Sequence, residues 1–212
     1  MKKLIHFGTD RTARQITFAA AALLIAFALG ACAHRHAADT QPLDNSGMSY
    51  AAVQQLNSLN VTRAEIPEIL TAYNAGFTDE DCVQIVRLFH SRGQGFKSGD
   101  AVASLIQSGL DGEMILSLAN LNQLGPTYGE YEAMHLAGLS DPIILAVAQK
   151  RDDNKPVLSG ASLAGLKNTG LRGSTLLELA RRGVPDTEAN AIISLRRRGA
   201  SDSQILRRFS GS

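Results

Sequence analysis

Apolar residues spaced three and four positions apart recur in short stretches along most of the chain. Such positions fall on one face of an α-helix, whereas the sustained apolar–polar alternation expected of strands is not found. Clear stretches are Ile66, Ile69, Leu70 and Tyr73; Cys82, Ile85, Val86 and Phe89; Met114, Ile115, Leu118 and Leu121; and Ala189, Ile192 and Ile193. The pattern predicts an all-α fold.

A recurring turn signal separates the helical stretches. It begins with Gly or Asn, which tolerate the left-handed backbone that ends a helix, and usually continues with an apolar residue that packs back. A Ser, Thr, Asp or Pro follows, suited to the first turn of the next helix. The copies are Asn60-Val61-Thr62, Gly76-Phe77-Thr78, Gly109-Leu110-Asp111, Gly138-Leu139-Ser140, Gly170-Leu171-Arg172-Gly173-Ser174, Gly183-Val184-Pro185-Asp186 and Gly199-Ala200-Ser201, with looser ones at Gly95-Phe96-Lys97-Ser98 and Gly125-Pro126-Thr127.

These signals predict about ten short capped helices. Capping boxes are expected at Thr62 with Glu65, Thr127 with Glu130, and Ser201 with Gln204. Helices of two to three turns are marginal alone in water, so they must pack on one another. Two helices make a unit near 30 residues, the length of helical-hairpin repeats, although known repeat signatures are missing. We therefore expect an irregular helical-hairpin array or a compact bundle, with one helix kinked at Pro67 or beginning there.

The first residues of the chain form a separate pattern. Residues 1–15 carry four basic side chains and one acidic one, and Ile16–Leu29 has no charge. A membrane-spanning helix needs about 20 apolar residues, and this run is shorter. A short apolar run after a basic start is typical of a secretory signal peptide.

The residues that follow, Leu29-Gly30-Ala31-Cys32, resemble the lipobox of bacterial lipoprotein precursors. The resemblance covers about the first 32 residues and implies that Cys32 carries a diacylglycerol, that the signal is cut before it, and that the new amine is acylated. It implies a lipid-anchored protein of the bacterial cell envelope. Because Ala33 stands where an Asp would retain such a protein in the inner membrane of enteric bacteria, the periplasmic face of the outer membrane is favoured. The alternatives are an ordinary signal peptide or an uncleaved anchor.

Charge and turn composition divide the rest of the chain. Residues 32–166 hold 8 basic and 15 acidic side chains, whereas residues 167–212 hold 9 and 4. The polar run 151–156 is the best boundary between them. The predicted organisation is a signal peptide at 1–31, the lipidated Cys and a flexible tether at 32–49, an acidic helical lobe at 50–150 and a basic helical lobe at 157–212.

Composition excludes several classes of protein. With 212 residues, two Cys and a net charge of +1, the chain is neither a disulfide scaffold nor a four-Cys zinc protein, nor a bulk electrostatic binder of nucleic acid. Motifs such as Gly-x-Ser-x-Gly, His-Glu-x-x-His and Cys-x-x-Cys are missing. We therefore expect neither an enzyme nor a cofactor. The alternative is an envelope hydrolase that brings His90 and His135 together with a carboxylate.

Three smaller features have simple structural interpretations. Cys32, His34 and His36 suggest a metal site, but a lipidated Cys32 cannot ligate a metal as a thiolate, so no metal is expected. Cys82 lies on an apolar helix face and is expected to be buried and inert, the other interpretation being an intermolecular disulfide. The glycine-rich residues 93–99 lack the order of a phosphate-binding loop and are expected to connect two helices, with Ser98 as the cap.

Arginine clusters are the sharpest feature of the C-terminal part. They are Arg181 and Arg182; Arg196, Arg197 and Arg198; and Arg207 and Arg208. Each stands at the end of a predicted helix, where a cation complements the helix dipole. The functional alternative is an anion-binding face. The sequence therefore favours a lipid-anchored helical interaction or scaffold module whose partner is an envelope protein or an anionic surface and not nucleic acid.

Overall fold

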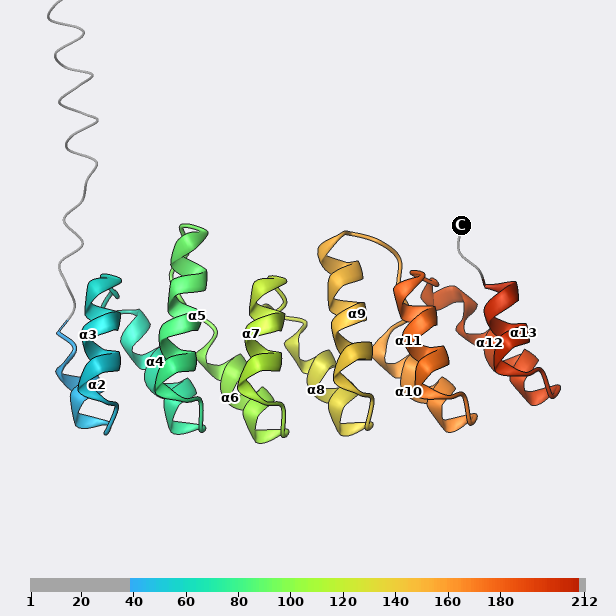
Figure 1. Ribbon diagram of the computed structural model, residues 1–212, viewed down its shortest axis with the longest axis horizontal. Helices are drawn as coiled ribbons and strands as arrows, with labels where there is room; N and C mark the ends of the chain where they lie inside the picture. Colours follow the sequence, from blue (N-terminus) through green and yellow to red (C-terminus); the bar gives the residue numbers. More distant parts are fainter. Residues whose placement is uncertain (1–38, 210–212) are drawn as a thin grey trace, which may run out of the picture. The chain divides into compact units, whose positions relative to one another are not determined.

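The computed structural model describes residues 39–209, and these residues are all helical apart from turns and loops, as predicted. Figure 1 shows a succession of helical hairpins. The first helices of the hairpins are α2 (Gln41–Asn45), α4 (Glu65–Asn74), α6 (Gly99–Gln107), α8 (Tyr128–Leu136), α10 (Gly160–Asn168) and α12 (Ala189–Arg197). The second helices are α3 (Tyr50–Ser58), α5 (Asp79–Ser91), α7 (Gly112–Asn120), α9 (Asp141–Asp152), α11 (Gly173–Arg181) and α13 (Asp202–Arg208). A short 3-10 turn, η1 (Asp186–Glu188), precedes α12.

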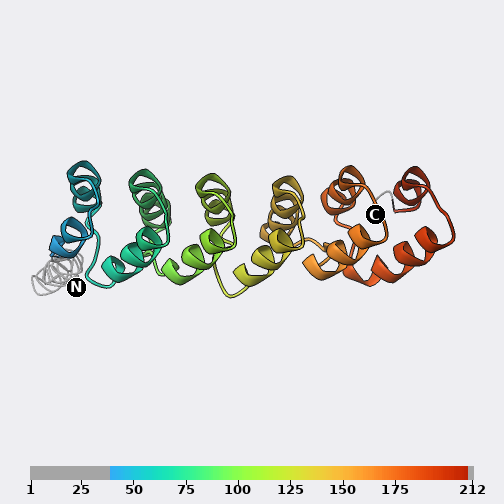
Figure 2. The same ribbon diagram turned by 90° about the horizontal axis from the view of Figure 1, so that it is seen from below.

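The hairpins stack in two rows of helices. Each first helix packs on the first helices of the neighbouring hairpins, and the second helices do the same, with α4 against α6 and α9 against α11 as the most extensive contacts. Figure 2 shows the two rows, called below the first row and the second row. Successive second-row helices begin 29 to 33 residues apart. Of the two expected architectures, the described residues therefore form the helical-hairpin array.

The core lies between the two rows and is built mainly from aliphatic side chains. Tyr131 and Phe96 are the largest fully buried side chains, among many Leu, Ile and Val. Each helix alone is short, so its stability comes from this shared burial. The stack continues past the polar loop that was predicted at 151–156, where α9 ends at Asp152 and α10 begins at Gly160, because α8 packs on α10 and α9 on α11.

The predicted turn signals coincide with most of the helix ends. The glycines of these turns have a positive φ, for example 112° at Gly76, and Ser201 forms the predicted capping box with Gln204. Two signals are displaced: the left-handed residues are Gly93 and Asn122 instead of Gly95 and Gly125. The helix that contains Pro67 begins two residues earlier, at Glu65, because proline is tolerated in the first turn.

Other local predictions were wrong. Arg172, not Ser174, is the N-cap of α11. Neither Thr62 nor Thr127 completes its predicted capping box: α4 starts after Ala64, and the Thr127 side chain makes no cap hydrogen bond. Residues 40–49, which were predicted to belong to a flexible tether, are instead part of the helical stack. They include α2, whose Leu43 is fully buried.

Carboxylates from one hairpin cap helices of a neighbouring hairpin. In the first row, Glu68 of α4 accepts the amide of Gly99, the first residue of α6, at 2.8 Å, and Glu130 of α8 accepts that of Gly160 in α10 at 2.6 Å. Further pairs of this kind are Asp79 with the Ser49 amide, Asp186 with the Ser159 amide and Asp202 with the Arg172 amide. These bonds satisfy amides that an isolated helix leaves unpaired, and they fix the register between hairpins.

Basic side chains cap the opposite helix ends. Arg92, the C-cap of α5, donates to the Ala119 carbonyl at the end of α7, and Arg182, the C-cap of α11, donates to the Leu206 carbonyl in α13. In the first row, Lys167 of α10 donates to the Ala137 carbonyl beyond α8. A cation at these carbonyls also complements the helix dipole. Charged side chains that the sequence alone would place on the solvated surface therefore hold neighbouring hairpins together.

A regular contact sets the spacing of the first row. The eighth residue of each of four successive first-row helices lies against the turn glycine of the preceding hairpin. The pairs are Ile106 with Gly76, His135 with Gly109, Lys167 with Gly138 and Arg196 with Gly170. A Cβ atom at Gly138 would lie 2.6 Å from the Lys167 Nζ, so the glycine leaves room for the neighbouring helix.

Candidate interaction surface

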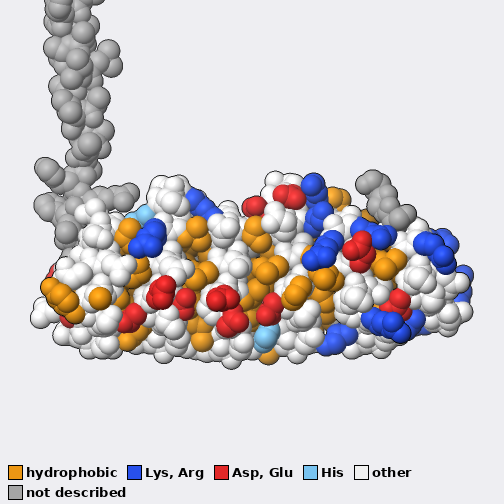
Figure 3. Space-filling view, viewed as in Figure 1, with side chains coloured by type: hydrophobic (Ala, Val, Ile, Leu, Met, Phe, Trp, Pro, Cys, Tyr) orange, Lys and Arg blue, Asp and Glu red, His pale blue; other side chains and the backbone are white. Residues whose placement is uncertain are grey.

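The outer face of the second row carries two surface hollows. Figure 3 shows apolar side chains between the helices of this row, acidic side chains across its lower part, and most Lys and Arg toward the C-terminal end. Two hollows of about 650 and 600 Å³ lie on the second row. These volumes fall within the range of small-ligand and peptide sites.

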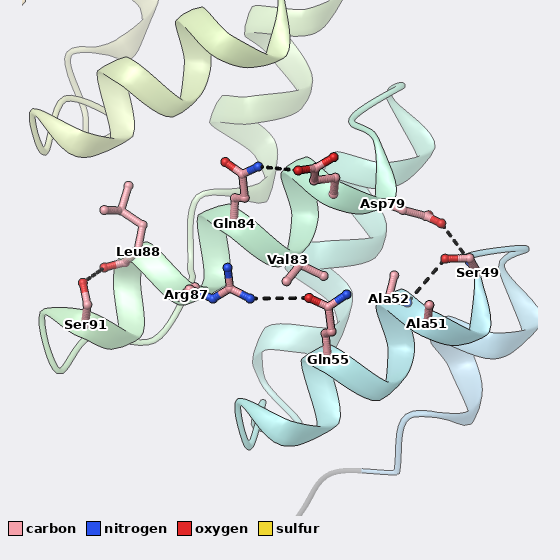
Figure 4. Close-up of a pocket in the computed structure, with 11 residues that line it drawn as sticks. Ser49, Ala51, Ala52, Gln55, Asp79, Val83, Gln84, Arg87, Leu88 and Ser91 are labelled. Atoms are coloured by element: carbon pink, nitrogen blue, oxygen red, sulfur yellow. Dashed lines mark hydrogen bonds between the residues drawn. The ribbon is translucent and has the colours of Figure 1, made fainter.

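The first hollow lies between α3 and α5 (Figure 4). Ala51, Ala52 and Val83 supply apolar lining, and small side chains on α3 leave the space open. The polar groups around it already have partners in the described residues. Asp79 accepts from the Ser49 amide at 3.0 Å, Arg87 donates to the Gln55 carboxamide at 3.4 Å, and Gln84 bonds to Glu80 at 3.1 Å. Both signs of charge line this hollow, and neither dominates.

The second hollow lies among α7, α9 and α11. Its apolar lining comes from Leu121, Pro142, Leu145 and Ala146. Its charged lining residues are Lys150 of α9 and Arg181 of α11, and no carboxylate lines it. Arg181 belongs to a predicted arginine cluster, whereas Lys150 was not predicted, because a single Lys near a helix end gives no cluster signal.

The seven arginines of the predicted anion-binding face are divided by the structure. All lie in the last turn or at the C-cap of α11, α12 or α13, as predicted. Arg182 and Arg196 stabilise contacts between neighbouring hairpins. Arg182 bonds to Glu178 at 2.7 Å and to the Leu206 carbonyl at 2.6 Å, so its guanidinium joins α11 to α13.

Arg196 is a clamp between the last two hairpins. Its guanidinium donates to the Gly170 carbonyl at 2.8 Å, to Asp202 at 3.1 Å and to the Ala200 carbonyl at 3.2 Å. Asp202 in turn accepts from the Thr175 hydroxyl at 2.7 Å. This Thr175 bond, with the Arg172 amide and the nearby Arg196 and Arg172 charges, lowers the pKa of Asp202 despite the opposing effect of burial.

The remaining arginines do not form one face. Arg181 lines the second hollow, whereas Arg198 and Arg208 line a separate hollow of about 410 Å³ at the end of α12 and α13. Arg197 and Arg207 have exposed side chains in the same terminal hairpin. The predicted seven-residue face is therefore split into two clamps, a terminal group and one residue of the second-row hollow.

His90 and His135 belong to different parts of the stack. His90 lies on α5, which packs on α3, α4 and α7, and its ring nitrogens contact the Leu59 carbonyl at 3.0 Å and Glu65 at 2.6 Å. His135 lies on α8 and fills the space beside Gly109. The two histidines therefore share no site, and within residues 39–209 no group of three or more His, Cys, Asp or Glu could hold a metal.

Glu65 is the most deeply buried charged residue among residues 39–209, at 1% exposure. Its carboxylate accepts from the Phe96 amide at 2.8 Å, from both the amide and the hydroxyl of Thr62 at 2.8 Å, and from His90. Burial raises the pKa of Glu65, but these hydrogen bonds, first those from the two amides, outweigh burial and hold the pKa below its ordinary value. The site joins α4, α5 and the segment that leads into α6.

Cys82 and residues 93–99 have structural roles. Cys82 is fully buried, and burial, with Asp79 and Asp81 nearby, raises the pKa of its thiol to about 12. Residues 93–99 connect α5 to α6. Ser98 makes no side-chain cap hydrogen bond. Glu68 takes the Gly99 amide, and a Cβ at Gly99 would collide with the Glu68 backbone. The lipobox Leu29-Gly30-Ala31-Cys32 and the pair His34 and His36 lie outside the described residues.

Comparison with known proteins adds no assignment. The chain matches no family model, no curated protein and no solved structure. No helix within residues 39–209 is long and apolar enough to cross a membrane. The second-row surface and the lipobox are therefore the features that point to a function.

Proposed function

We propose that the chain is a lipid-anchored protein of the bacterial cell envelope that acts as a helical interaction module. The second-row face is the working surface, and a protein of the envelope is the partner. The observation that carries this proposal is the stack itself: several of its charged side chains bridge neighbouring hairpins, whereas two of its surface hollows lie on one row of helices. Helical-hairpin stacks offer long surfaces of this kind for partners.

The anchor in this proposal is a lipid on Cys32, at the periplasmic face of the outer membrane. Each buried CH₂ contributes about 0.8 kcal/mol, so two or three acyl chains hold a protein firmly at a membrane. Eight residues, 33–40, separate Cys32 from α2.

Metabolic labelling with a lipid precursor tests the anchor. We expect Cys32→Ala to abolish labelling and to leave the precursor uncleaved by the lipoprotein peptidase. Cys82→Ala is the matched control, since it removes the other cysteine of the chain and should leave labelling intact. Normal processing and labelling of the Cys32→Ala chain would refute the lipoprotein assignment.

Affinity capture from envelope extracts of the native host tests the interaction. A specific protein partner is expected with the wild-type chain. The proposal fails if no partner is captured while the purified protein turns over an envelope substrate, because that result identifies an enzyme.

A further inference from the structure

The second hollow of the second row is lined by cations and by no carboxylate, a property that it shares with the smaller terminal hollow of Arg198 and Arg208 but not with the first hollow. Lys150 reaches it from α9 and Arg181 from the end of α11. The stem of Lys150 lies beside the turn that follows α11, since its Cδ lies 3.7 Å from the position of a Cβ at Gly183. Two hairpins therefore bring their cations to the same hollow.

Two of the acids close in sequence to these cations have other partners. Glu178 of α11 pairs with Arg182 at 2.7 Å, and Asp153, beyond α9, pairs with Lys155 at 3.3 Å and with Gln149 at 3.3 Å. The side-chain nitrogens of Lys150 and Arg181 make no hydrogen bond or close ion pair with any residue from 39 to 209, although Lys150 contributes to the lowered pKa of Asp153. Both cations are thus available to a carboxylate from another molecule.

We propose that this hollow binds a peptide segment of the partner in which a Glu or Asp side chain stands next to apolar residues. The carboxylate lies between Lys150 and Arg181, and the apolar side chains pack on Leu121, Leu145 and Ala146. Ser117, Asn120 and Gln149, which also line the hollow, offer hydrogen bonds to peptide amides and carbonyls. An acyl chain would leave these groups without partners, so the lining favours a peptide over a lipid.

The first hollow provides an internal comparison. It has a similar volume, but Asp79 and Glu80 line it together with Arg87. Of the two second-row hollows, the second therefore discriminates more strongly in favour of an acidic segment, since like charges across an interface are unfavourable. This proposal rests on the proposed function and names the chemistry that its surface recognises.

Selection from a phage library of random 12-residue peptides tests the inference. The full chain in mild detergent is the bait, and the double variant Lys150→Glu/Arg181→Glu is used for counter-selection. We expect enriched peptides to carry Asp or Glu next to Leu, Ile, Val or Phe. Lack of enrichment, enrichment without an acidic excess, or the same peptides on the double variant would overturn the proposal.

Titration of the most enriched peptide measures the contribution of each cation. Arg181→Glu and Lys150→Glu should each weaken binding about tenfold or more, and Arg181→Gln by less, with unchanged thermal unfolding showing that the fold is kept. Lys97→Glu makes the same charge change in the α5–α6 connection, outside both hollows, and should leave affinity unchanged. An equal loss in Lys97→Glu would show a mere net-charge effect and would overturn the site.

Binding to lipid vesicles tests whether a membrane surface, and not a peptide, occupies the hollow. Wild-type and Arg181→Glu chains are compared on vesicles of phosphatidylcholine with and without phosphatidylglycerol. We expect Arg181→Glu to leave vesicle binding unchanged, whereas a loss confined to anionic vesicles, without peptide enrichment, would identify a lipid surface instead. Failure of these tests with intact lipid labelling and partner capture rejects the hollow and not the proposed function.

Discussion

Replacing Glu65 by Ala should destabilise the array more than any other single loss of a charged group described above. The carboxylate is 1% exposed and accepts four hydrogen bonds, two from Thr62 and one each from Phe96 and His90. Its removal leaves the buried Phe96 amide without a partner and His90 without its carboxylate. Breaking a buried pair in this way costs about 3–5 kcal/mol.

Thermal and urea unfolding of the full chain measure this cost. For a domain of this size, about 3–5 kcal/mol corresponds to a fall in Tm of about 6–20 °C. Glu68→Ala is the matched control on the same helix, because the Glu68 side chain accepts a hydrogen bond of 2.8 Å from the Gly99 amide. Its loss should cost about 1.5–3 kcal/mol. A Glu65→Ala variant no less stable than Glu68→Ala would refute the central role of Glu65.

The location of the damage gives a second measurement. In a stack of hairpins each unit is stabilised by its neighbours, so loss of one contact weakens the adjacent units first. Hydrogen exchange should accelerate at Phe96 and in α6 well before α11 is affected. Uniform acceleration along residues 39–209 would show that Glu65 acts on the whole fold and not on the α4–α6 junction.

The remaining predictions concern other polar groups and the thiol. Arg196→Ala should lower the free energy of unfolding by about 1–3 kcal/mol, because the Gly170 carbonyl and Asp202 lose their donor. Arg197 has an exposed side chain, so Arg197→Ala should change stability by less than about 0.5 kcal/mol. Equal effects of the two substitutions in urea unfolding would contradict the clamp. Cys82 should resist iodoacetamide at pH 8 until the protein unfolds, as judged by intact mass, since burial raises its thiol pKa to about 12; rapid native labelling would contradict its burial. The pKa of Glu65 and that of Asp202 are lowered in the fold, so the stability that these carboxylates contribute is complete above the ordinary carboxyl range and is lost as pH falls through the folded pKa values. Stability should therefore decline on acidification, and Glu65→Gln should reduce that decline. A pH profile of Glu65→Gln identical to that of the wild type would contradict this prediction.

Local signals predicted the helices well, because a turn such as Gly76-Phe77-Thr78 needs only its own residues to end one helix and start another. The Thr78 side chain does accept from the Asp81 amide. Glu130 shows the limit of such reasoning. It stands at the capping-box distance from Thr127, yet its carboxylate goes to the Gly160 amide and to Arg151 at 2.6 Å each. Local and distant amides compete for the same side chain, and spacing alone does not decide between them.

The arginine run at 196–198 also shows that spacing in the sequence does not decide which side chain reaches a neighbouring hairpin. Three identical side chains in sequence point in different directions on a helix, and only Arg196 faces the preceding hairpin. A signal was nevertheless present. Arg196 stands three residues before a turn glycine, as His135 and Lys167 do, and all three lie against the preceding hairpin. The hollow with Lys150 could not be predicted, because it depends on how three hairpins meet.

Site-specific photo-crosslinking in the native host tests the central claim, that the second-row face is the surface that holds a partner. A photoreactive residue is placed at Gln149 or Ser91, each of which lines one of the two second-row hollows, and at exposed Asn168 of the first row as the control. The account predicts a discrete protein adduct from a second-row position and none from position 168. Adducts of equal yield from both rows, or from the first row alone, would contradict it.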